Sequence, residues 1–342
     1  MWSNHRSSGQ PRVPTTRQAF HQRPRTNPNN SIVGIIGPSS DPHGTPCGQV
    51  MACCHQRHVS VFLPAGPHTA PGRVVDVGRN RIGMNEPVGH MEAVPTSEPV
   101  GDVAEIRFTA VRGGHQVPAV AWLPATPAGS RVVLLGHGGS GHKGIHRHRV
   151  LAHQLASEGV ACLAIDGPYH GDRAVPGDGL LDYQRRVVDE GPEAVHARMR
   201  QDWLHALDHA SHRWGLDAES VGYFGVSMGA RYGIVVSAAL GPRLKTAVLG
   251  KFGLVTHDSM MLAVSANDVV RQCAAQINAP LLHHVQWNDE IFPLQGQLEL
   301  FDLFGSPEKI LRGRPGPHHQ TRADDLLAWS QHLAQYLRHT SR

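Results

Sequence analysis

Cysteine is scarce in this chain, and the few cysteines follow no regular pattern. The 342 residues contain five, an odd number without the spacing of a disulfide framework, which argues against a set of structural disulfides. Cys47, Cys53, Cys54 and His55 lie close together and raise the possibility of zinc. Their spacing fits no standard zinc site, so we expect no bound metal.

Long apolar stretches are also missing. No run approaches the roughly 18 apolar residues that a membrane-spanning helix needs. The run at 32–36 is too short, and too far from the start, for the core of a signal peptide. Aromatic residues make up 6% of the chain, which does not favour a large cleft lined by aromatic rings. We therefore expect a cytoplasmic protein that does not bind membranes.

The positive charge is concentrated near the start of the chain. The formal net charge is +4, but the residues up to 85 carry nine arginines and two acids, Asp41 and Asp76, a net charge of about +7. The remainder therefore carries about −3. A mildly acidic domain gives no reason to expect nucleic acid as a partner.

Residues 1–95 are rich in proline, glycine, serine, arginine and histidine, and show no sustained period of 2 or 3.6 residues. This composition predicts a disordered N-terminal extension. Because the segment is rich in arginine and poor in acids, a targeting arm is one alternative. A translation start at Met84 or Met91 is another.

From about residue 103 the pattern becomes that of a folded domain. Segments 104–111 and 116–123 alternate or run apolar around a Gly-Gly turn, which predicts a hairpin. Short apolar runs then alternate with segments of helical spacing. The predicted strands are 131–135, 160–165, 221–226, 246–250, 280–287 and 309–311, and the predicted helices are 150–157, 194–214, 265–277, 294–304 and 321–337. Such alternation predicts an eight-stranded, mostly parallel sheet with helices on both faces and an antiparallel edge.

Residues 221–233 carry the clearest chemical signal, V-G-Y-F-G-V-S-M-G-A-R-Y-G. An apolar run turns through Gly225, Ser227 and Gly229 into a helix-forming run, which is the G-x-S-x-G pattern between a strand and a helix. The two glycines remove the Cβ atoms that would collide in so sharp a turn. This nucleophile elbow predicts that Ser227 is the nucleophile and that the backbone N–H of Met228 points at an oxyanion.

A serine hydroxyl is a weak nucleophile unless a base takes its proton and a third group orients that base. In an open α/β sheet, such groups lie at the carboxyl ends of the strands. Asp289 follows the strand predicted at 280–287 and is our candidate acid, with Glu290 as its rival. The loop after the last strand carries two histidines. We predict His318 as the base and keep His319 as the alternative.

An oxyanion hole needs two backbone N–H donors. The loop after the strand 131–135 reads H-G-G-S-G, and its glycines allow the backbone to approach a substrate closely. We predict Gly139 as the second donor beside Met228, with Gly138 as a weaker alternative. His137 is interpreted as a brace of this loop. The glycines do not form the G-x-G-x-x-G pattern of a phosphate-binding loop.

Two further features surround the predicted site. Asp166 and His170 follow the strand predicted at 160–165 and resemble an acid and a base, but their loop precedes the nucleophile. We predict that they brace the loop or line the substrate pocket. Residues 173–200 are predicted to include a small cap over the pocket, and a surface loop before a longer helix is the alternative.

Five loops in the correct order resemble the α/β-hydrolase superfamily, and within it the serine hydrolases that are similar to dienelactone hydrolases and acyl peptidases. The motifs are L-L-G-H-G-G-S-G at 134–141, A-I-D-G-P-Y-H-G-D at 164–172, G-V-S-M-G at 225–229, W-N-D-E at 287–290 and P-G-P-H-H at 315–319. The chain order of serine, aspartate and histidine is that of this superfamily. In relatives the last motif often reads P-G-G-H, which places the base at His318.

The resemblance implies an α/β-hydrolase catalytic domain at 103–340 that cleaves a carboxylic ester through an acyl-enzyme, with no metal or organic cofactor. Lactonase, thioesterase and peptidase activities stay open, because they use the same groups. A peptidase would usually carry a β-propeller, for which the chain is too short. The non-enzyme alternative is an inactive hydrolase scaffold used for binding. The expected partner is a small-molecule ester, and no oligomeric state is indicated.

Overall fold

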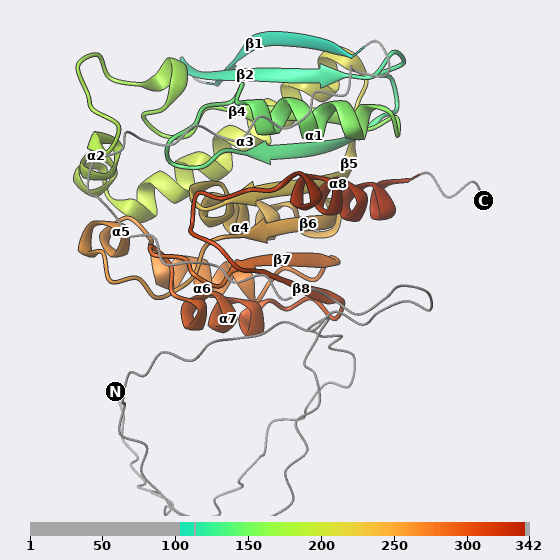
Figure 1. Ribbon diagram of the computed structural model, residues 1–342. Coiled ribbons are helices and arrows are strands. Elements are labelled where there is room, and N and C mark those ends of the chain that lie inside the picture. Colours follow the sequence, from blue (N-terminus) through green and yellow to red (C-terminus); the bar gives the residue numbers. More distant parts are fainter. Residues whose placement is uncertain (1–102, 113, 339–342) are drawn as a thin grey trace, which may run out of the picture. The chain divides into compact units, whose positions relative to one another are not determined.

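The computed structural model of this chain describes residues 103–112 and 114–338, which are coloured by position in Figure 1. The extension predicted at 1–95 lies outside the described residues, together with the zinc candidates and the alternative starts within it. Among the helices that are described, none combines the length and the apolar character that crossing a membrane requires.

Eight strands form one sheet. They are β1 Ala104–Arg112, β2 His115–Leu123, β3 Arg131–Gly136, β4 Ala161–Ile165, β5 Asp217–Val226, β6 Leu244–Gly250, β7 Leu281–Gln286 and β8 Lys309–Arg314. Their order across the sheet is β1-β2-β4-β3-β5-β6-β7-β8. β2 pairs antiparallel with both β1 and β4, and every other neighbouring pair is parallel. The predicted eight-stranded, mostly parallel sheet with an antiparallel edge is confirmed.

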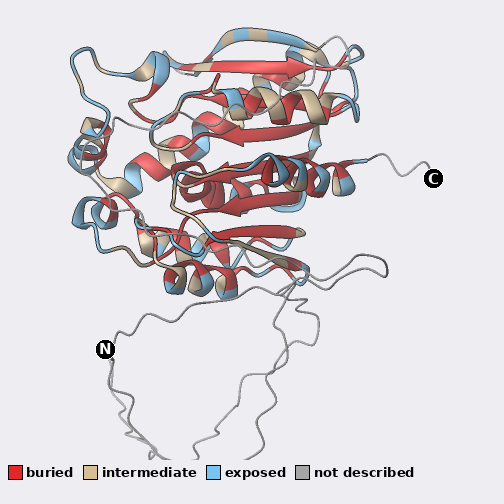
Figure 2. Cartoon of the chain, in the orientation of Figure 1, coloured by how far each residue is buried: buried red, intermediate tan, exposed pale blue. Residues whose placement is uncertain are grey.

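The strand sequences explain why both faces of the sheet are covered. In β3, Val132 and Leu134 belong to one hydrophobic cluster, whereas Val133 and Leu135 belong to another on the opposite face. Successive side chains of a strand point to opposite faces, so a strand that is apolar at every position needs a layer on each side. Figure 2 shows the central strands as buried between the helices, whereas the edge strand β1 is mostly exposed.

Eight helices supply the two layers within the described part of the chain. They are α1 His146–Ala156, α2 Asp182–Glu190, α3 Pro192–Trp214, α4 Met228–Leu240, α5 Ser259–Ala263, α6 Asn267–Ala274, α7 Leu294–Leu303 and α8 Ala323–Leu337. α1 and α8 pack on one face of the sheet, around Phe224 and Trp329. α3, α4, α6 and α7 contribute to the cluster on the other face.

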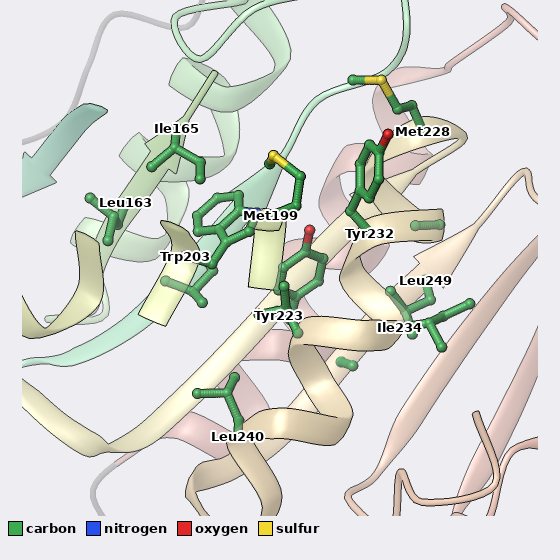
Figure 3. Close-up of a cluster of buried hydrophobic side chains, with 14 of the residues drawn as sticks. Leu163, Ile165, Met199, Trp203, Tyr223, Met228, Tyr232, Ile234, Leu240 and Leu249 are labelled. Atoms are coloured by element: carbon green, nitrogen blue, oxygen red, sulfur yellow. The ribbon is translucent and has the colours of Figure 1, made fainter. Parts of the chain in front are cut away.

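α4 is the most deeply enclosed of these helices. Nearly all of its side chains are buried, because α4 contacts α3 and α6 as well as the sheet. Figure 3 shows part of this packing, with Trp203 of α3 close to Tyr223 of β5 and with Tyr232 on α4. The Trp203 and Tyr223 rings lie edge to face, with centroids 5.8 Å apart. This dense packing fixes the end of α4 that follows Ser227.

The structure corrects several predicted boundaries. α2 was not predicted as a helix; it lies in the segment that was predicted to include a small cap, and its buried side chains are Tyr183, Gln184 and Val187. A helix this short and this polar offers few apolar positions from which it could be predicted. The single helix predicted at 265–277 is α6, preceded by the short α5, and Ala266 between them has a positive φ of 45° that ends regular helix geometry.

Candidate active site

The turn around Ser227 places its side chain at the carboxyl edge of the sheet. β5 ends at Val226, α4 begins at Met228, and Ser227 between them has a φ of 58°. A positive φ is costly for a residue with a Cβ, and such strain is concentrated at functional sites. A Cβ on Gly225 would collide with the backbone of Gly229. The Ser227 N–H donates to the carbonyl of Gly250 at 2.9 Å, which ties the turn to β6.

The structure brings His318 to the serine. His318 lies in the loop between β8 and α8, and its Nε2 is 2.9 Å from Ser227 Oγ. The backbone N–H of His318 donates to the Glu290 carboxylate at 2.8 Å, which helps to orient this loop. His319 is exposed to solvent. Of the two histidines considered from the sequence, His318 is therefore the one that reaches Ser227.

Asp289 completes a line of hydrogen bonds. It follows β7, and its Oδ2 is 2.8 Å from His318 Nδ1. Its Oδ1 accepts the backbone N–H groups of Ile291 at 2.9 Å and Phe292 at 2.8 Å, which fixes the carboxylate. An ionised carboxylate only accepts, so Nδ1 of His318 carries the hydrogen, and the lone pair of Nε2 faces the Ser227 hydroxyl. Glu290, the rival acid, contacts the backbone of the histidine rather than its ring.

The glycine loop lies beside Ser227. A Cβ on Gly138 would stand 4.0 Å from the Cβ of Ser227. The Gly138 carbonyl accepts from the Gly141 N–H at 3.0 Å and from His137 Nδ1 at 2.8 Å. These two bonds fix the peptide plane that carries the N–H of Gly139. Met228 is the first residue of α4, where backbone N–H groups have no partner within the helix.

His137 braces this loop as a neutral ring. Its Nε2 accepts the N–H of Gly167 at 2.8 Å, so Nδ1 carries the hydrogen that binds the Gly138 carbonyl. Burial holds the pKa of His137 well below its usual value, and the neighbouring His170 lowers this pKa further. A ring that stays neutral keeps both hydrogen bonds over a wide pH range.

Asp166 and His170 hold neighbouring loops together. The buried Asp166 carboxylate accepts from the Lys143 ammonium at 2.6 Å, from the Lys143 N–H at 2.8 Å and from the Asp172 N–H at 2.9 Å. The ring nitrogens of His170 lie 2.7 Å from the carbonyl oxygens of Pro168 and Gly139. These contacts support the bracing interpretation. No motif in the local sequence marks Lys143 for this role.

A second buried lysine, Lys251, supports the loop that carries His318, a role that was not predicted from the sequence. Lys251 follows β6 and has a φ of 50°. Its ammonium donates to the Gln320 carbonyl and, at 3.0 Å, to Thr321 Oγ1. Gln286, at the end of β7, donates to the Pro317 carbonyl at 3.0 Å. These side chains hold the loop on both sides of His318, but nothing in the local sequence around them marks this role.

The segment predicted to contain the cap holds α2. Tyr183 of α2 is buried, and its hydroxyl stands 2.6 Å from the position that a Cβ on Gly139 would take. The Tyr183 ring also contacts the ring of His170, with centroids 4.4 Å apart. α2 therefore packs directly on the glycine loop. Among the described residues, no cluster of three or more His, Cys, Asp or Glu side chains has the arrangement of a metal site.

Comparison with known proteins identifies the family. No protein-family model and no curated protein matches the chain. The solved structure of a cold-adapted esterase from an Arctic intertidal metagenomic library, in complex with PEG, is 32% identical, with a TM-score of 0.59, and the match covers 72% of this chain and all of the esterase.

Two more distant structures share the fold. A dienelactone hydrolase from Anabaena variabilis is 19% identical over 68% of this chain and 96% of its own, with a TM-score of 0.50. Acetyl xylan esterase 1 from Thermoanaerobacterium is 18% identical over 70% of this chain and 86% of its own, with a TM-score of 0.53. The resemblance stated from the motifs is confirmed: the chain belongs to the α/β-hydrolase superfamily and has the dienelactone-hydrolase-like fold.

Proposed function

We propose that this chain is a serine hydrolase that cleaves a carboxylic ester through an acyl-enzyme intermediate. The observation that carries the proposal is the continuous hydrogen-bonded line from Ser227 Oγ through His318 to Asp289, with distances of 2.9 and 2.8 Å. A nucleophile, a base and an orienting acid in this arrangement are what acyl transfer requires. The cold-adapted esterase matches this chain over the whole of its own length. This match supports assignment to the carboxylic ester hydrolases.

The first half of the reaction forms the acyl-enzyme. His318 Nε2 takes the proton of the Ser227 hydroxyl while Oγ attacks the ester carbonyl carbon. Asp289 holds the ring through Nδ1–H and stabilises the imidazolium that forms. The backbone N–H groups of Met228 and Gly139 donate to the oxyanion of the tetrahedral intermediate. His318 then gives its proton to the leaving alcohol, and the carbon–oxygen bond to that alcohol breaks.

The second half releases the acid. Water enters beside His318, Nε2 takes one of its protons, and the hydroxide attacks the acyl carbonyl carbon. The oxyanion forms again at the same two N–H groups. The imidazolium then returns its proton to Ser227 Oγ as the acyl–oxygen bond breaks. Both halves use side chains and backbone groups of this chain as acid, base and donors.

Substitution of Ser227 and of His318 tests the mechanism. Hydrolysis of p-nitrophenyl esters from two to twelve carbons should lose about 10⁴- to 10⁶-fold in kcat with Ser227→Ala or His318→Ala. His319→Ala is the matched control, because His319 is the exposed neighbour of the proposed base. Activity that survives His318→Ala but is lost in His319→Ala would move the base to His319.

The alternatives need separate measurements. Lactones, thioesters and peptides offered to the same preparation separate those activities from ester cleavage. A fluorophosphonate probe should label the wild type and fail to label Ser227→Ala. An inactive scaffold used for binding would hydrolyse no ester and would not be labelled at all, which would overturn the proposal.

A further inference from the structure

Arg231 is a buried cation that the described chain leaves without a counter-charge. Its side chain is 1% exposed. Nε and Nη1 are buried without a hydrogen-bond partner among the residues that the structure describes, and Nη2 donates only to the hydroxyl of Tyr232, at 3.2 Å. Arginine keeps its charge in proteins, and a buried charge is costly unless it is paired. The guanidinium therefore has unused donors and needs an anionic partner.

The guanidinium lies near the catalytic end of α4. Arg231 comes one helical turn after Ser227, and helical side chains lean towards the start of their helix. Figure 3 shows the hydroxyl of Tyr232, the partner of Arg231, directed towards the end of α4 that carries Met228. A narrow space of about 10 Å³ is lined by Tyr232 and Met228 together with Gly136 and His137 of the glycine loop. Apolar side chains, among them Met199 and Trp203, complete its lining, Arg231 does not line it, and it has room for about one water molecule.

The polar groups around Arg231 are donors. The Tyr232 hydroxyl accepts from Arg231, which leaves its own hydrogen for another acceptor. Burial raises the pKa of Tyr232 although the charge of Arg231 opposes this rise, so the hydroxyl stays protonated. Tyr183 in turn stands against Gly139 of the glycine loop. The hydroxyls of Tyr183 and Tyr232 are thus hydrogen-bond donors that lie between the glycine loop and the charge of Arg231.

His196, which packs against Tyr232, does not neutralise this charge. Its ring lies 4.8 Å from the ring of Tyr232, centroid to centroid. Burial, and after it the charge of Arg231, lower the pKa of His196 to about 3, so the ring is neutral at physiological pH. Its Nδ1 lies 2.6 Å from the Pro192 carbonyl and so carries the hydrogen. The cluster of Arg231, Tyr232, Tyr183 and His196 therefore keeps a net positive charge.

We propose that Arg231, with the hydroxyls of Tyr232 and Tyr183, forms a subsite for a carboxylate, so that the preferred substrate is an ester that also carries a carboxylate group. This inference rests on the proposed ester hydrolysis. A carboxylate accepts hydrogen bonds and donates none, which matches a row of donors beside a guanidinium. Because the space beside Tyr232 holds about one water molecule and is not lined by Arg231, the carboxylate enters when α2 shifts. α2 lies between Gly177 and Gly191, which both have positive φ values.

The test uses pairs of esters of equal shape that differ in charge. Monoethyl glutarate is compared with ethyl 5-methylhexanoate, which places the charge on the acyl side. The alcohol side is tested with 3-(butanoyloxy)propanoate against 3-methylbutyl butanoate. For each pair, the ratio of kcat/KM for the charged ester to that for the neutral ester is measured by ethanol or acid release. In at least one pair, Arg231→Met should lower this ratio about 10- to 100-fold, as expected for a lost charged hydrogen bond.

Matched variants separate a binding role from a structural one. Arg200→Met removes one charge from the exposed face of α3 and should leave the ratio unchanged. Arg231→Lys should retain part of the preference, and Tyr232→Phe should lower the ratio several-fold. A ratio that is the same in wild type, Arg231→Met and Tyr232→Phe overturns the subsite. If Arg231→Met fails to fold and Tyr232→Phe leaves the ratio unchanged, Arg231 is structural and the proposal is wrong.

The effect of glutarate on thermal unfolding tests the carboxylate subsite separately from the proposed ester hydrolysis. Glutarate should raise the thermal unfolding temperature of wild type and of Ser227→Ala, but not that of Arg231→Met. If no ester is hydrolysed and this pattern is found, the carboxylate subsite stands and the ester reaction is wrong. If esters are hydrolysed but glutarate has the same effect on all three proteins, the subsite is wrong and the ester reaction stands.

Discussion

The buried ammonium of Lys251 should make the stability of the protein depend on pH in a defined direction. The side chain is 2% exposed, and burial lowers its pKa from 10.5 to about 7. Arg147 lowers this pKa further, while Asp325 and Asp289 raise it. In the unfolded chain the pKa returns to about 10.4. The unfolded state therefore binds more protons between about pH 7 and pH 10.4, so this group makes the fold more stable as pH rises through that window.

The size of the effect follows from the shift. One pKa unit corresponds to about 1.4 kcal/mol, and the interval from pH 6 to pH 9 includes about two units of the window. Lys251 should therefore add about 3 kcal/mol to the free energy of unfolding between these pH values. Lys251→Met removes this contribution. The variant also loses the hydrogen bonds to Gln320 and Thr321, which lowers its free energy of unfolding by about 1–3 kcal/mol in total. This loss is nearly the same at both pH values.

Urea unfolding at pH 6 and pH 9 measures the effect. The free energy of unfolding of wild type minus that of Lys251→Met should grow by about 3 kcal/mol from pH 6 to pH 9. Lys245→Met is the control, because the Lys245 ammonium binds the Pro242 carbonyl at the surface. That variant should keep the pH dependence of the wild type. A wild-type minus Lys251→Met difference that is equal at the two pH values would refute the reasoning.

Two further substitutions test the loops around Ser227. Gly139→Ala should lower kcat without unfolding the protein, because the new Cβ would stand 2.6 Å from the Tyr183 hydroxyl and displace the glycine loop. Adding Tyr183→Phe should restore part of the rate, and equal rates for the single and double variants would contradict this. Lys143→Met should lower the free energy of unfolding by about 3–5 kcal/mol, measured in urea, since it leaves the buried Asp166 carboxylate without its cation. A loss below about 1 kcal/mol, typical of an exposed pair, would show that Asp166 is not a buried charge.

The residues of the proposed triad could be located from the sequence because their chemistry imposes local patterns. Ser227 needs glycines on both sides of a sharp turn, and these are visible in one short segment. Asp289 and His318 each follow a strand, and the carboxyl ends of parallel strands lie at one edge of the sheet. The choice of His318 over His319 rested on the resemblance, and the structure directs His318 towards Ser227.

Other features could not be predicted, because their effects depend on contacts distant in sequence. The partners of Lys251 lie about 70 residues further along the chain. Asp166 was noticed as an acid, but its cation, Lys143, stands in a different loop and has no pattern around it. α2 was missed because its inward-facing side chains are few and its remaining positions are polar. Tertiary packing, rather than local periodicity, stabilises this short helix.

Three buried cations lie near the carboxyl edge of the sheet, and their partners differ in a way that bears on function. Lys143 meets the carboxylates of Asp166 and Asp172. Lys251 donates hydrogen bonds to a carbonyl and a hydroxyl of the loop that carries His318, and its lowered pKa limits the cost of its burial. Arginine side chains stay charged in proteins. Two guanidinium nitrogens of Arg231, Nε and Nη1, have no hydrogen-bond partner among the described residues. Both lysines have acceptors within the described residues, whereas Arg231 meets no described carboxylate, and this difference supports the proposed carboxylate subsite.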